Sequence, residues 1–89
     1  MSKLNTALQN DLKLLKLLRD ETALQAHLLA ADTKDRWQAL EADWAKLETK
    51  LEQAQDAAGE ALAEAESAIG MMVDALRGGY ENVRAALKR

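Results

Sequence analysis

The amino-acid sequence predicts an all-α protein in which long amphipathic helices form an antiparallel helical hairpin that associates into a coiled-coil-type bundle. Well over half of the 89 residues are Ala, Leu, Glu, Lys or Arg, a composition typical of coiled coils and long helices. The chain contains no proline and four glycines, so few positions can end a helix. An apolar stripe also keeps one helical phase across most of the chain. The length allows one small helical domain over residues 1–89.

The first expected helix carries the run LKLLKLL at residues 12–18, which is strongly amphipathic. Its leucines form two neighbouring stripes on a helical wheel. The first stripe contains Leu4, Leu8, Leu15, Leu18 and Leu29, and the second contains Leu14, Leu17, Leu24 and Leu28. Together with Leu12 they cover more than half of the helix circumference, and a helix of that kind needs two apolar neighbours. We therefore expect this segment to contact a second chain, a partner helix or a lipid surface.

A single apolar stripe continues from Trp37 to Leu87 in steps of three and four residues. Within an arc of about 100° on the helical wheel, it contains Trp37, Leu40, Trp44, Leu47, Leu51, Ala54, Ala58, Leu62, Ala65, Ile69, Met72, Leu76, Tyr80, Val83 and Leu87. An extra step of four between Ala58 and Leu62 corrects the heptad spacing and keeps the stripe straight. This pattern predicts helices that bury one continuous face.

Three places can interrupt the helices. Asp32 can serve as an N-cap, and Gly59 can end a helix. The tandem Gly78-Gly79 is expected to be the most flexible point of the chain. Because the stripe stays in phase across Gly59, the sequence favours few breaks, with the main turn near Gly59. The alternative is a three-helix bundle with turns near both Asp32 and Gly59.

The sequence contains no constellation typical of catalysis or metal binding. There is no cysteine, which excludes disulfides and thiolate sites. The single histidine, His27, falls away from both leucine stripes and lacks the spacing of a metal-binding motif. The carboxylates follow the surface period of a helix, and no glycine-rich phosphate loop is present. We therefore expect a non-enzymatic protein without cofactor or metal.

Charge and hydropathy narrow the range of partners and locations. The net charge of −3 argues against nucleic-acid binding, which needs a basic face to neutralise phosphates. The longest uncharged run, residues 22–31, is too short to span a membrane. Asp11 and Lys13 interrupt the apolar core that a signal peptide would need. These features predict a cytoplasmic protein.

The candidate interaction residues are large apolar side chains. Trp37 and Trp44 lie seven residues apart on one face, where their indole rings are expected to fill the seam against another helix. The full candidate set is Leu4, Leu8, Leu14, Leu15, Leu17, Leu18, Leu24, Leu28, Trp37 and Trp44. We expect these residues to mediate self-association into a homo-oligomer or the capture of a partner helix of another protein. The alternative is a peripheral lipid- or granule-surface protein in which residues 3–29 lie on an anionic membrane surface.

A further pattern runs from Leu24, His27 and Leu28 to the Gly79-Tyr80 pair. Between these groups lies an acidic tryptophan segment that contains Asp35, Trp37, Leu40, Glu41 and Trp44. The pattern resembles that of a group of uncharacterised short bacterial helical, coiled-coil proteins, loosely described as apolipoprotein-like. The resemblance covers most of residues 20–87. It implies a cytoplasmic bacterial protein with long helices, and it implies no particular activity.

Overall fold

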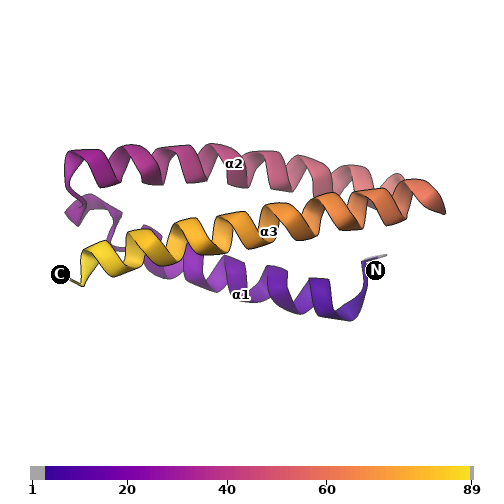
Figure 1. Ribbon diagram of the computed structural model, residues 1–89, viewed down its shortest axis with the longest axis horizontal. Coiled ribbons are helices and arrows are strands. Elements are labelled where there is room, and N and C mark those ends of the chain that lie inside the picture. The colour runs from indigo at the N-terminus through magenta and orange to yellow at the C-terminus, as the bar shows by residue number, and fades with distance from the viewer. Residues whose placement is uncertain (1–3, 89) are drawn as a thin grey trace.

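The computed structural model describes residues 4–88, which form three α-helices joined by short connections (Figure 1). Helix α1 spans Thr6–Ala23, α2 spans Ala31–Asp56 and α3 spans Glu60–Leu87. A short 3-10 helix, η1, covers Ala26–Leu28 between α1 and α2. The described residues contain no strand, and the predicted all-α class is confirmed.

Helices α2 and α3 form the antiparallel hairpin that the apolar stripe predicts, and α1 packs lengthwise against α3 (Figure 1). Helix α1 runs parallel to α3 and antiparallel to α2, and the bundle measures 45 × 20 × 17 Å. Helix α3 makes the main contacts with both other helices. The chain therefore has the expected turn near Gly59 and also a second break before α2, as in the three-helix alternative.

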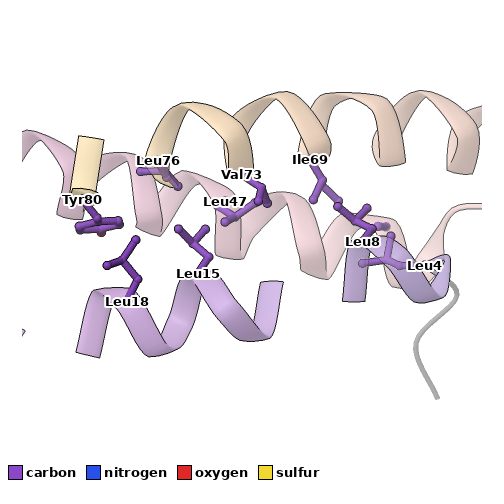
Figure 2. Close-up of a cluster of buried hydrophobic side chains, with 10 residues drawn as sticks. Leu4, Leu8, Leu15, Leu18, Leu47, Ile69, Val73, Leu76 and Tyr80 are labelled. Atoms are coloured by element: carbon purple, nitrogen blue, oxygen red, sulfur yellow. The ribbon is translucent and has the colours of Figure 1, made fainter. Parts of the chain in front are cut away.

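The core lies where the inner faces of the three helices meet (Figure 2). Leu15, Leu47 and Ile69 are 1 % exposed or less, and each comes from a different helix. Of the apolar stripe predicted for the second and third helices, only Ala58 is exposed, so the predicted buried face is confirmed. Val73 is buried although it lies outside that stripe, because α1 and α2 both pack against α3 and widen its buried face.

Asn5 caps α1 and ties its N-terminus to α3. The side-chain oxygen of Asn5 accepts a hydrogen bond from the Leu8 backbone N–H at 2.8 Å. This bond satisfies one of the N–H groups that the first helical turn leaves without a backbone partner. The Asn5 amide nitrogen Nδ2 donates to Glu66 Oε2 of α3 at 2.6 Å. One side chain therefore sets both the start of α1 and its position along α3.

Helix α2 begins at Ala31, so the prediction that Asp32 is its N-cap is wrong. Leu29 and Ala30 have extended backbone conformations, and Asp32 already lies in the first helical turn. There its carboxylate accepts a hydrogen bond from the Thr33 backbone N–H at 2.9 Å. A negative charge in the first turn also interacts favourably with the helix dipole. Asp32 therefore stabilises the helix start from within the first turn.

The glycines have different roles. Gly59 makes the turn between α2 and α3 with φ 59° and ψ −131°, a conformation that side-chain-bearing residues rarely adopt. Gly78 and Gly79 lie inside α3 without interrupting it, so the prediction that they can break the helix is wrong. A Cβ atom on Gly79 would collide with the side chain of Leu40 in α2. The missing side chain thus allows α3 to approach α2 closely, and the bundle keeps the helix intact.

Candidate functional site

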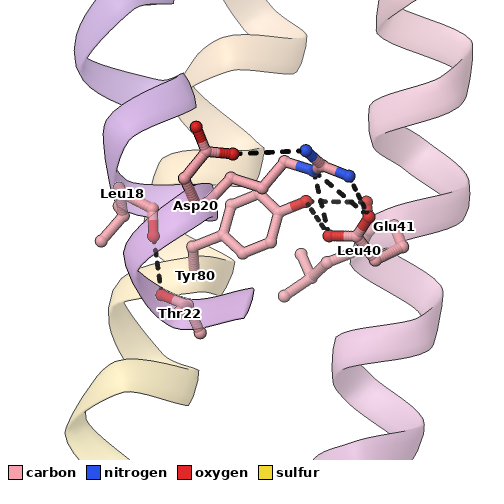
Figure 3. Close-up of polar contacts among 7 residues, drawn as sticks. Leu18, Asp20, Thr22, Leu40, Glu41 and Tyr80 are labelled. Carbon is pink, nitrogen blue, oxygen red and sulfur yellow. Dashed lines mark hydrogen bonds and ion pairs between the residues drawn. The ribbon is translucent and has the colours of Figure 1, made fainter. Parts of the chain in front are cut away.

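A polar cluster joins the three helices close to the end of α1 (Figure 3). It contains Arg19 of α1, Glu41 of α2 and Tyr80 of α3. The Arg19 guanidinium donates from Nε to both carboxylate oxygens of Glu41, at 3.1 and 3.2 Å, and from Nη2 to Oε2 at 2.7 Å. Both side chains are 27 % exposed, so the pair is partly shielded from water. A forked, charge-assisted contact of this kind fixes orientation as well as distance.

The ring of Tyr80 is fully buried, and its hydroxyl completes the cluster. The hydroxyl donates toward Glu41 Oε1 at 3.2 Å and approaches the Leu40 backbone carbonyl at 3.4 Å. Burial raises the pKa of Tyr80 well above its ordinary value, and the negative charge of Glu41 raises this pKa further. The hydrogen bond to Glu41 raises the pKa of Arg19 as well. Tyr80 therefore stays a neutral donor and Arg19 stays a cation across the physiological range.

Both tryptophans lie beside this cluster, inside the protein's own bundle. The rings of Trp37 and Tyr80 make an edge-to-face contact, with centroids 5.4 Å apart and planes at 62°. The Arg19 guanidinium carbon lies 5.0 Å from the centroid of the Trp44 ring, which is a cation–π contact. The two indoles pack alongside the core residues of the three helices. They fill a seam against other helices, and those helices belong to the same chain.

The cluster satisfies its own hydrogen-bonding groups. Among the described residues, every buried side-chain nitrogen or oxygen atom has a hydrogen-bond partner. Arg19 and Glu41 neutralise each other, and Tyr80 is oriented by the Glu41 carboxylate. Acid–base chemistry needs a titrating group that faces a substrate, and these groups face one another. The arrangement is therefore suited to aligning three helices.

The second candidate site is the outer side of α1 and the segment that follows it. Four large leucines are exposed there, and we call them the leucine face: Leu14 (60 % exposed), Leu17 (65 %), Leu24 (78 %) and Leu28 (67 %). Leu14 and Leu17 belong to α1, whereas Leu24 and Leu28 lie in the connection to α2. Beside Leu17, a shallow hollow is lined by Lys13, Lys16 and Asp20. The leucine face is thus an apolar surface with charged residues along one edge.

The structure divides the candidate interaction residues into three groups. Leu4, Leu8, Leu15 and Leu18 lie in the core of the chain itself. Trp37 and Trp44 are half-buried beside the polar cluster. The residues that stay exposed are the leucine face. Among these candidates, the leucine face offers the most exposed apolar surface to another molecule.

The residues of the polar cluster are absent from the candidates chosen by sequence. Arg19 and Glu41 are 22 positions apart, and Tyr80 lies 39 positions beyond Glu41. A charged residue and its partner on different helices leave no periodic signal in one chain. The available signal was the position of Arg19 at the edge of the buried leucine stripe, where a cation needs an anionic partner.

Within residues 4–88, no group of three or more His, Cys, Asp or Glu side chains is placed to hold a metal ion. His27 is exposed. None of the helices formed by these residues has the length and apolar character needed to cross a bilayer.

Comparison with known proteins found no match to a protein-family model, to a curated protein or to a solved structure. The resemblance to bacterial helical proteins therefore stays a prediction.

Proposed function

We propose that this protein is a non-enzymatic helical interaction module whose leucine face binds another amphipathic helix. The observation that carries the proposal is the exposure of four large leucines in the first third of the chain. Elsewhere in the described chain, Met71 is the one large hydrophobic residue with comparable exposure. Clustered exposed apolar residues mark binding surfaces more often than scattered ones do. The proposal keeps the cytoplasmic location that the sequence predicts.

The bundle does not need the leucine face for its own stability. Leu14 and Leu17 stay exposed, whereas Leu15 and Leu18, on the neighbouring side of α1, already close the core. Burying a fully exposed leucine contributes about 1.5–3 kcal/mol. Four leucines at this exposure therefore offer several kcal/mol to a partner, which offsets part of the entropy cost of association. A second apolar helix supplies a surface of matching shape.

The bundle also holds α1 in a fixed orientation. Arg19 fastens its C-terminal half to α2, and Asn5 fastens its N-terminus to α3. Glu21 adds a contact with Arg84 of α3 at 3.6 Å. Because α1 is already folded and positioned, binding through its outer side costs little additional ordering. A preorganised helix face is what an interaction module of this size needs.

A lipid surface is the competing occupant of the leucine face. Interfacial helices combine leucines with basic residues and with exposed Trp or Phe. Both tryptophans are half-buried beside the polar cluster, and the chain has no phenylalanine. Asp20 and Glu21 are exposed next to the leucines and would face anionic headgroups. These features favour a helix over a membrane.

The proposal is tested with the variant Leu14→Gln/Leu17→Gln and the matched control Met71→Gln. Glutamine is a good helix former, adds no charge, and replaces side chains of similar exposure in all three positions. The probes are the protein itself, followed by sedimentation velocity, and a synthetic leucine-heptad helical peptide, followed by calorimetric titration. We expect self-association or saturable peptide binding that the double variant loses and Met71→Gln retains.

Two results would overturn the proposal. One is a chain that neither self-associates nor binds the heptad peptide. The other is flotation of the protein with anionic lipid vesicles at physiological salt that Leu14→Gln/Leu17→Gln abolishes and Met71→Gln does not. In that case the leucine face is a surface for lipid.

A further inference from the structure

The exposed side of α1 has the spacing of a coiled-coil seam, separate from the face that the bundle buries. Along α1 and its C-cap residue, steps of three and four residues connect Ala7, Asn10, Leu14, Leu17, Glu21 and Leu24. All of these residues are exposed, and we call them the outer seam. Alternating steps of three and four are the heptad spacing at which two helices pack side by side. The outer seam therefore extends the leucine face into a surface with a defined register.

The outer seam is complementary to itself when it is read in the opposite direction. An antiparallel copy centred between Leu14 and Leu17 places Leu14 opposite the copy's Leu17. In the same register Asn10 faces Glu21, whose carboxylate also contacts Arg84 of its own chain at 3.6 Å. Ala7 faces Leu24, a small residue against a large one. Because the dimer is symmetric, each of these facing pairs occurs twice, once on either side of the centre. This arrangement is a closed two-fold interface, which leaves no surface for further growth.

The charges beside the seam agree with the same orientation. Lys13 and Asp20 lie seven residues apart on one flank, where they line the hollow beside Leu17. In an antiparallel pair, the flank with Lys13 and Asp20 on one chain faces the same flank of the other chain. Lys13 of each chain therefore lies near Asp20 of the other. In a parallel pair Glu21 would instead face Glu21 in the same layer, and like charges at such positions are destabilising. The charge pattern thus favours the antiparallel arrangement.

We propose that the occupant of the leucine face is a second copy of this chain, packed antiparallel through α1 in this register. The proposal rests on the proposed function and specifies its partner. One helix pair of this length lies at the low end of the ~1,200–2,000 Å² that stable interfaces bury. The dimer is therefore a reversible one, whose population depends on concentration.

The register is tested by disulfide cross-linking between two single-cysteine variants, Ala7→Cys and Leu24→Cys. The chain contains no cysteine of its own, so each variant carries one thiol. In the proposed register these two positions face each other, whereas each lies about 25 Å along the axis from its own copy, at 1.5 Å per residue. With one variant enlarged by a tag, we expect the mixed disulfide to be the main oxidised product. Ser67→Cys, on the exposed side of α3, is the control for random collision.

Charge exchange provides the second test, followed by sedimentation over a hundredfold range of concentration. Lys13→Glu brings a carboxylate close to Asp20 of the other chain at both ends of the symmetric dimer. The repulsion is expected to weaken association about tenfold. The exchange Lys13→Glu/Asp20→Lys restores the opposite pairing and should restore most of the association. Because these side chains are exposed, the bundle itself is expected to stay folded, which far-ultraviolet circular dichroism checks.

The possible outcomes separate the two proposals. Dominant Ala7→Cys and Leu24→Cys self-disulfides would show a parallel pair and overturn the register. A chain that stays monomeric while it binds the heptad peptide would overturn self-pairing and leave the interaction module intact. A chain that does neither would overturn both.

Discussion

Leu14 and Leu15 are adjacent in the sequence, yet they belong to two different surfaces. Leu15 is 1 % exposed and packs in the core, whereas Leu14 is 60 % exposed on the outer side of α1. The same helix thus has one leucine-rich side that completes the bundle and another that the bundle leaves uncovered. On α3, by contrast, the outer side carries one large exposed hydrophobic residue, Met71. The inner leucines therefore serve folding, and the exposure of the outer leucines supports the proposal that they serve association.

The largest expected effect is the difference in stability loss when each of these two neighbouring leucines is replaced by alanine. Leu15→Ala removes a fully buried side chain and leaves a cavity, which is expected to lower the free energy of unfolding by about 3 kcal/mol. Leu14→Ala removes a side chain that is mostly in water, with an expected change below about 0.5 kcal/mol. Urea unfolding of both variants, at a concentration where the protein is monomeric, measures the contrast. Equal destabilisation would contradict the division of α1 into two surfaces.

A smaller effect is expected at the polar cluster, which holds α1 in place. Glu41→Gln removes the charge that Arg19 and Tyr80 share, and is expected to lower the free energy of unfolding by about 1–2 kcal/mol. A double-mutant cycle with Arg19→Gln measures the coupling between the two side chains. The exposed pair of Lys46 and Asp43 at 3.9 Å is the matched control, with an expected coupling below about 0.5 kcal/mol. Equal coupling in both pairs would mean that the cluster does not align the helices.

A further effect is a dependence on pH that appears only in alkaline solution. The folded state raises the pKa of Tyr80, so it holds the phenolic proton more tightly than the unfolded chain, whose pKa is about 10. Stability linked to Tyr80 is therefore fully present below pH 10 and is lost as the pH rises above it. Because the chain has a single tyrosine, tyrosinate absorbance reports this group alone.

We expect the tyrosinate signal to appear together with unfolding, measured by circular dichroism. The variant Tyr80→Phe should remove the part of the alkaline destabilisation that belongs to this residue. A tyrosine that ionises near pH 10 while the helices stay folded would contradict its burial in the cluster.

Much of the fold was predictable from local pattern. Helical composition and heptad spacing predict the helices and the buried face from Trp37 to Leu87. Gly59 was predictable as the main turn because a backbone with positive φ strongly favours glycine. The excess of leucine on α1 likewise predicts that some of its apolar surface faces a partner. These features depend on residues close together in the chain, and periodicity reports them directly.

The remaining features depend on which helices meet. Both leucine stripes of α1 have the right spacing, and packing against α3 decides that Leu15 faces inward while Leu14 stays outside. The contact between Arg19 and Glu41 joins two helices across a turn, so no sequence period reveals it. Gly79 resembles a helix breaker in the sequence, and only the approach of α2 shows why a small residue lies there. Helix periodicity thus determined the amphipathic faces, and tertiary packing decided which of them remained exposed.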